Sequence, residues 1–136
     1  MVQDAGFFAT WAPRMLSILR IVVGALYLQH GTAKLLHLPP VAAVDGVQLM
    51  SLIGLAGVLE IVGGFLLLIG LFTRLVAFVL SGEMAFAYFM AHAPRGALPI
   101  LNGGELAVLY CFVFLYFAVA GGGPWRASAR SASPFA

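Results

Sequence analysis

The chain has 136 residues, of which 62% are hydrophobic and 9% are charged, and its formal net charge is +2. An ordinary soluble domain carries roughly 25% charged residues, so the surplus of apolar residues must face lipid. The seven basic residues form no run that could follow phosphates, which excludes a nucleic-acid partner, and the single cysteine, Cys111, excludes an intramolecular disulfide and a multi-thiolate metal site. Composition and length therefore predict one integral membrane domain that contacts the lipid bilayer.

Four apolar segments are each close to the roughly 20 residues that a helix needs to cross a bilayer. They cover residues 15–36, 49–70, 75–91 and 104–120. Because lipid offers no partner for backbone polar groups, each segment is predicted to be helical. The sequence thus predicts an all-α integral membrane four-helix bundle, with an N-terminal segment at 1–14 and a C-terminal tail at 121–136.

Proline and glycine mark the ends of these segments. Pro39 and Pro40 stop the first helix, since proline lacks an amide hydrogen and disfavours helical geometry in the residue before it. The break at 70–74 is short, so the second and third helices are expected to be antiparallel neighbours, with Thr73 as N-cap of the third. The run Gly-Gly-Gly-Pro at 121–124 ends the fourth.

The distribution of basic residues predicts the orientation in the membrane. An even number of spans puts both termini on one side. That side carries Arg14, Arg74, Arg126 and Arg130. The opposite side carries Lys34 and Arg95. Because basic residues concentrate in cytoplasmic loops, both termini are predicted to be cytoplasmic.

Charged residues within the spans need a partner or a function, because a charge at the bilayer centre costs at least about 2.5 to 3.5 kcal/mol. The first helix carries one polar stripe, given about 100° of rotation per residue. The stripe contains Arg20, Tyr27, Gly31 and Lys34, with His30 at its edge. In one interpretation Arg20 and Lys34 extend to opposite headgroup layers while His30 hydrogen-bonds another helix. In the other, the stripe forms the polar wall of a ligand pocket.

The second helix places an acid among glycines. Glu60 has Gly57 three residues before it and Gly63 and Gly64 just after it, and small residues at this spacing let another helix approach closely. Glu60 is therefore expected at a helix–helix contact, where it must be neutral or paired with a cation such as Arg20 or Lys34. It could simply lock the bundle through a hydrogen bond, or it could take part in ligand binding.

Several polar residues are expected to converge near the outer side. Glu105 lies in the first turn of the fourth helix, and His92 lies at the end of the third, on the same side as His30 and Lys34. Capping of the helix dipole alone could explain Glu105. Convergence of these side chains with Arg20 and Glu60 instead predicts a ligand-binding site. Gly103 and Gly104 are expected to serve helix packing.

Glu83 stands apart from the other polar residues of the third helix. Ser81, Tyr88 and His92 share one face of that helix, and Glu83 lies nearly opposite to them. A partner subunit, a contact between copies of the chain, or a protonated acid would each explain it. We treat Glu83 as a candidate partner contact.

Three blocks of the chain resemble the DoxX family of small bacterial membrane proteins. They are RIVVGALYLQHGTAKLLHLP at 20–39, GVLEIVGGFLLLIGLFTRLVA at 57–77 and NGGELAVLYCFVFLYFAVAGGGPW at 102–125. The resemblance implies a four-helix bundle in the bacterial inner (plasma) membrane, similar to the small subunit of thiosulfate:quinone oxidoreductase. It also implies a role in a redox system that handles a quinone or supports a partner oxidoreductase. Glu83 departs from the apolar residue expected in that part of the third helix.

Two main hypotheses follow for the function. In the first, the protein is a redox-associated membrane subunit that binds a quinone-like ligand near the outer side, with His30 and Lys34 at its carbonyl oxygens and Glu60 and Glu105 exchanging protons. In the second, it is a non-catalytic assembly or scaffold protein that docks another membrane protein through Glu83. Small-solute transport by an oligomer is a weaker third. The sequence identifies no catalytic residue and no metal site, and whether the protein is an enzyme stays open.

Overall fold

The structure, a computed structural model, describes residues 2–127. They form four long helices and one short one. These are α1 (Val2–Leu36), α2 (Leu52–Ile69), α3 (Thr73–Ala87), α4 (Pro99–Asn102) and α5 (Glu105–Ala120). A 3-10 turn lies between α1 and α2, and α3 runs on through a π-helical turn, Tyr88–His92. The described residues contain no strand, which confirms the predicted all-α class.

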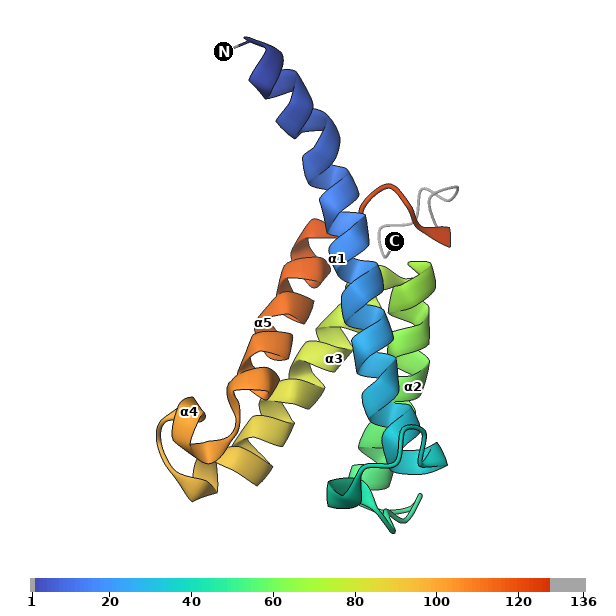
Figure 1. The fold of residues 1–136 in the computed structure, drawn as a ribbon, viewed down its shortest axis with the longest axis vertical. Coiled ribbons are helices and arrows are strands. Elements are labelled where there is room, and N and C mark those ends of the chain that lie inside the picture. The colour runs from blue at the N-terminus through green and yellow to red at the C-terminus, as the bar shows by residue number, and fades with distance from the viewer. Residues whose placement is uncertain (1, 128–136) are drawn as a thin grey trace.

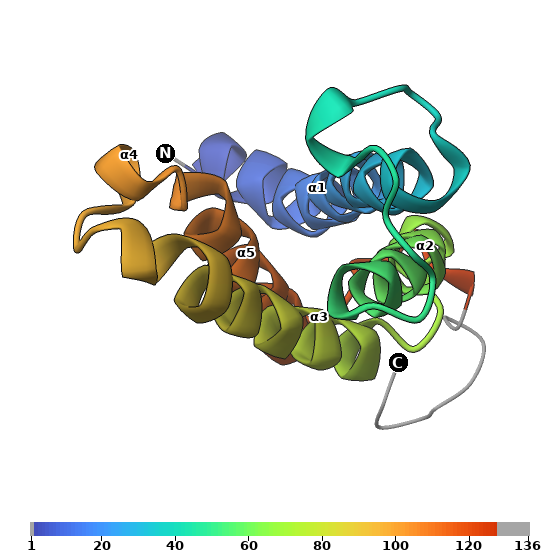
Figure 2. The ribbon, with the colours of Figure 1, turned by 90° about the horizontal axis from the view of Figure 1, so that it is seen from below.

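The long helices are arranged as two pairs (Figure 1). α1 packs chiefly on α2, and α3 packs chiefly on α5. The pairs meet at the end of the bundle where α5 ends and diverge toward the end that carries α4, as the view from below also shows (Figure 2). α3 also contacts α2, and α1 meets α5 through Tyr27 and Phe114, whose ring centroids are 4.8 Å apart.

The helices are suited to a membrane. In the described part of the chain, three are long and apolar enough to cross a bilayer: Gly6–Leu36, Leu52–Ile69 and Thr73–Arg95. α5 is apolar as well and has 16 residues. Large apolar side chains remain exposed along all four helices, including Phe65 on α2 and Phe112 on α5, as expected where lipid covers the surface. The fold is a membrane helical bundle.

The first helix is longer than predicted. It begins at Val2 and has Pro13 inside it, whereas the predicted span begins at residue 15. One proline removes a single backbone hydrogen bond, and the preceding residues contain no other strong break, so the helix continues through it. At about 1.5 Å per residue, 35 residues reach about 52 Å, which exceeds the roughly 30 Å hydrocarbon layer. Residues 2–14 therefore extend α1 beyond the other helices (Figure 1).

Two helix starts also differ from the prediction. Ser51 caps α2, with its hydroxyl accepting a hydrogen bond from the Gly54 amide at 3.0 Å. The N-cap of α3 is Phe72, and Thr73 is already inside the helix and fully buried. The turn from Gly70 to Phe72 uses left-handed backbone at both ends, which completes the reversal before Thr73 is reached. The prediction that Thr73 is the N-cap was wrong.

Glycine allows α1 and α2 to touch along their backbones. A Cβ placed on Gly64 would lie 2.8 Å from the Leu28 amide nitrogen, and one on Gly24 would lie 2.8 Å from that of Leu68. Gly57 faces the side chains of Lys34 and Leu35, so the contact continues along the helix pair. Gly63 faces Leu80 of α3 instead. The glycines flanking Glu60 therefore bring α2 close to both α1 and α3.

Two arginines hold the end of the bundle where the pairs meet. Arg20 is fully buried and donates to the Leu67 carbonyl at 2.8 Å and to the Trp125 carbonyl. Arg74 donates to the Ala118 carbonyl at 3.2 Å and to that of Val119. Cations stabilise the carbonyl ends of helices, here α2 and α5. Arg126 lies near the same end, and Arg130 lies outside the described residues.

Candidate functional site

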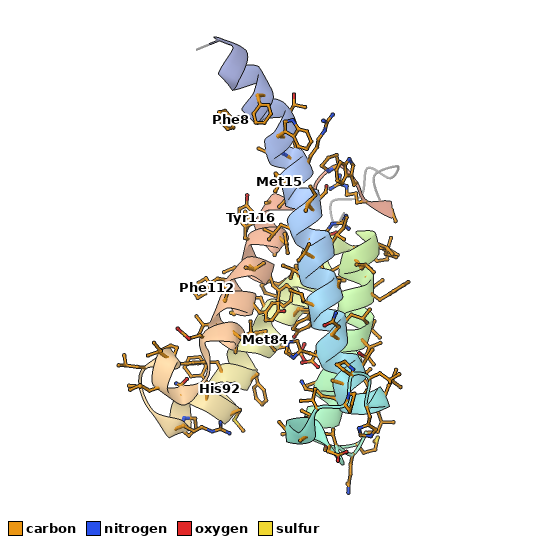
Figure 3. All side chains as sticks on the ribbon, viewed as in Figure 1. Phe8, Met15, Met84, His92, Phe112 and Tyr116 are labelled. Carbon is orange, nitrogen blue, oxygen red and sulfur yellow. The ribbon has the colours of Figure 1, made fainter. Side chains whose placement is uncertain are left out.

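A cavity of about 560 Å³ lies between the two helix pairs, toward the end where they diverge. Its walls are mostly apolar and come from every long helix. Its polar and aromatic lining residues are Tyr27, His30, Lys34, Glu60, Glu83, Phe86, His92 and Tyr110. Figure 3 shows Met84, which lines the cavity, on α3, whereas Phe112 and Tyr116 project from the outer side of α5.

An ion pair joins α1 to α2 in this cavity. The Lys34 Nζ lies 2.5 Å from Oε1 of Glu60. The side chain of Glu60 is 3% exposed and that of Lys34 is 17% exposed, so neither charge is left to water. The sequence offered both Arg20 and Lys34 as partners for this acid. The structure selects Lys34, because Arg20 is two helical turns beyond Tyr27 and is already bound to carbonyls at the other end of the bundle.

A second polar contact joins α1 to α3. The Tyr27 hydroxyl donates to Oε2 of Glu83 at 2.9 Å. Glu83 therefore faces the cavity and α1, whereas its expected role as a partner contact stays a prediction. The reason is that α3 has two inward faces: Ser81 donates to the Cys111 carbonyl of α5 at 2.8 Å, while Glu83 faces α1.

Aromatic rings form one wall of the cavity. Tyr27 and Tyr110 meet edge to face with ring centroids 5.2 Å apart, and His30 meets Tyr110 at 6.0 Å. Tyr27 also packs on the fully buried Phe114, at 4.8 Å. Such edge-to-face contacts fix ring orientations and contribute about 0.5 to 1.5 kcal/mol each. The wall is thus a pre-formed surface against which a flat ring can pack.

His92 lies at the rim, where α3 ends. Its Nδ1 donates to the Asn102 carbonyl at 3.1 Å, which leaves Nε2 available to a ligand. Asn102 is 3% exposed and organises this loop: it donates to the Gly96 carbonyl at 2.8 Å and accepts from the Gly104 amide at 2.8 Å. Gly103 adopts a left-handed φ of 72° that ends α4, and Gly104 sits beneath Tyr88. Gly103 shapes the turn, and Gly104 lets the start of α5 pack closely on Tyr88, in the π-helical turn that continues α3.

Two predicted site residues lie elsewhere. Arg20 belongs to the opposite end of the bundle, although it shares a helix stripe with Lys34. Glu105 is exposed in the first turn of α5 and borders a separate hollow together with Pro99 and Phe112. The structure therefore brings together His30, Lys34, Glu60 and His92, but not Arg20 or Glu105.

The sequence reasoning missed two cavity residues of consequence. Tyr27 and Tyr110 were considered, with Tyr88 and Tyr116, as tyrosines that could wall a flat ring or pack the bundle, but neither was placed among the ligand-binding candidates. Tyr27 lies seven residues before Lys34, two helical turns away on the same face, which was a usable signal. Tyr110 carries no such signal, because α5 is apolar around its whole circumference.

Comparison with known proteins identifies the family. The DoxX family model matches residues 15–93, which is more than half of the chain and includes every charged residue of the cavity. An uncharacterized protein of Haemophilus influenzae is 50% identical over 117 residues, covering 83% of this chain and 87% of that protein. No solved structure matches. The chain belongs to the DoxX family.

Proposed function

We propose that the protein is a membrane subunit of a redox system and that its cavity binds a quinone-class lipid. The observation that carries the proposal is the pair of polar contacts, Lys34–Glu60 and Tyr27–Glu83, inside an otherwise apolar cavity. The volume of about 560 Å³ lies within the roughly 300 to 1,000 Å³ of typical small-molecule sites. A few polar groups in an apolar pocket are what such sites use to orient a ligand.

The chemistry of the lining suits a flat ring that carries oxygen atoms. The ring would pack against Tyr27, His30 and Tyr110, and an apolar tail would lie toward the lipid between the diverging helix pairs. His30 and Lys34 offer hydrogen bonds to the ring oxygens. When bound, a quinone exchanges electrons together with protons, and the imidazole of His30 and the carboxyl groups of Glu60 and Glu83 are proton-exchanging groups. A partner oxidoreductase would supply or receive the electrons.

The proposal also covers the localisation of the protein and its orientation in the membrane. We place the chain in the bacterial inner membrane with four spans and with both termini in the cytoplasm. Arg74 and Arg126 lie at the end where the helix pairs meet, and Arg14 lies in the N-terminal part of α1. They support this orientation through the preference of basic residues for the cytoplasmic side. The cavity then opens in the outer half of the bilayer.

Retention of a quinone by the purified protein tests the proposal. We expect a membrane quinone to co-purify with the wild type in mild detergent, and His30→Ala to lower its amount per protein about tenfold, the loss expected from one hydrogen bond and one ring contact. Glu105→Gln, which changes a carboxylate outside the cavity, should retain the wild-type amount. Extraction and quantitative mass spectrometry measure all three. Equal quinone in the wild type, in His30→Ala and in protein-free micelles would contradict the proposal.

A further inference from the structure

Two carboxylate oxygens of the cavity residues have no hydrogen-bond donor. Lys34 contacts Oε1 of Glu60, and Tyr27 donates to Oε2 of Glu83. The second oxygen of each acid, Oε2 of Glu60 and Oε1 of Glu83, is buried and receives no hydrogen bond from any described residue. Glu60 as a whole is 2% exposed. The residues that line the cavity therefore hold two unsatisfied acceptors, one on α2 and one on α3.

An unsatisfied buried acceptor selects for a ligand that donates. Leaving such a group unpaired is costly, so a ligand that supplies a donor gains affinity over one that does not. A ring carbonyl can only accept, whereas a ring hydroxyl both donates and accepts. A hydroxyl can thus accept from the ammonium of Lys34 and donate to the free oxygen of Glu60 at the same time. A ring carbonyl in that place would set two acceptors against each other, the carbonyl oxygen and the free oxygen of Glu60.

We infer that the cavity prefers the reduced, hydroxyl-bearing form of its ligand, a hydroquinone, over the quinone. The two ring hydroxyls donate to Oε2 of Glu60 and Oε1 of Glu83, while the ring packs between Tyr27 and Tyr110. This inference rests on the proposed function and names the redox form that the site recognises. The charged groups of the lining agree with this preference. Among the described residues of the cavity, the one cation, Lys34, stands against two acids, Glu60 and Glu83.

Three ligands that differ only at the ring oxygens test the preference. We would measure equilibrium binding of a short-tailed hydroquinone, its quinone and its dimethyl ether to the protein in lipid nanodiscs without oxygen, with empty nanodiscs subtracted. The hydroquinone is expected to bind at least about tenfold more tightly than the quinone and the ether, as expected for hydrogen bonds to charged acceptors. Equal affinities, or a tighter quinone, would overturn the inference while leaving the proposed function intact. Absence of saturable binding by both redox forms would overturn both.

Glu83→Gln provides the sharpest variant. The amide oxygen can still accept from Tyr27, while an amide nitrogen, a donor, takes the place of the free oxygen. The ratio of hydroquinone to quinone affinity should therefore fall about tenfold, whereas Glu105→Gln should leave it unchanged. Glu60→Gln replaces the other free oxygen and should lower the same ratio in the same way, so this variant carries the test if Glu83→Gln does not fold. An unchanged ratio in a folded Glu83→Gln or Glu60→Gln would overturn the inference.

Discussion

Replacing Lys34 with methionine is expected to lower the free energy of unfolding by about 3 to 5 kcal/mol, because Glu60 would keep a buried charge without a partner. The two side chains are 17% and 3% exposed and lie 2.5 Å apart, so water compensates little of the loss. Methionine has a similar length and shape, which limits the effect of packing. Unfolding in a titration from mild to denaturing detergent, followed by circular dichroism, measures the change.

The double variant Lys34→Met/Glu60→Met separates stability from function. Replacing a whole buried pair with apolar residues is often neutral or stabilising, so most of the lost stability should return. Ligand binding should not return, because the polar group shared by α1 and α2 is gone. If the double variant is as unstable as the sum of the two single variants, the two residues do not act as a pair, and the assignment of this contact is wrong.

Replacing Gly64 with valine is expected to destabilise the protein by about 3 kcal/mol. Even the Cβ would lie 2.8 Å from the backbone of Leu28, so the added side chain must push α1 away from α2. The separation would also move Lys34 away from Glu60. We therefore expect a lower midpoint in the same detergent titration, together with loss of ligand binding.

Gly82→Ala is the matched control for the glycine contact. Gly82 lies inside α3, and a Cβ there would meet nothing within 4 Å. Alanine favours helix over glycine by about 0.8 to 1 kcal/mol in water, so this variant should be unchanged or slightly more stable. If Gly64→Val were tolerated as well as Gly82→Ala, the α1–α2 contact would not depend on close backbone approach.

The helices themselves could be predicted because membrane helices carry strong local signals. Apolar length located all four, and glycine spacing located the contact face of α2 around Glu60. The start of α1 could not be placed from the same signals, since a single proline, Pro13, reads as a break and is in fact accommodated. Polar spacing on α1 correctly put Lys34 and Tyr27 on one face.

The position of each polar residue along the bundle could not be predicted from its helix face. Arg20 and Lys34 share a stripe, but they lie at opposite ends of it and meet different partners. Glu83 was treated as a candidate partner contact because it lies opposite the other polar residues of its helix, whereas α3 has two inward faces. Glu105 was grouped with the cavity by its depth in the membrane, although α5 turns it outward. Depth and face must both match before two side chains can meet.

Photolabelling is the most direct test of the claim that the cavity between the helix pairs is the ligand site. A quinone analogue with a photoreactive group on its ring would be irradiated with the protein in nanodiscs, and the labelled peptides would be mapped by mass spectrometry. We predict saturable labelling of cavity residues such as Met84, Met90 and Tyr110, which excess unlabelled quinone removes. Labelling confined to outward-facing residues such as Phe65 and Phe112, or labelling that quinone does not displace, would contradict it.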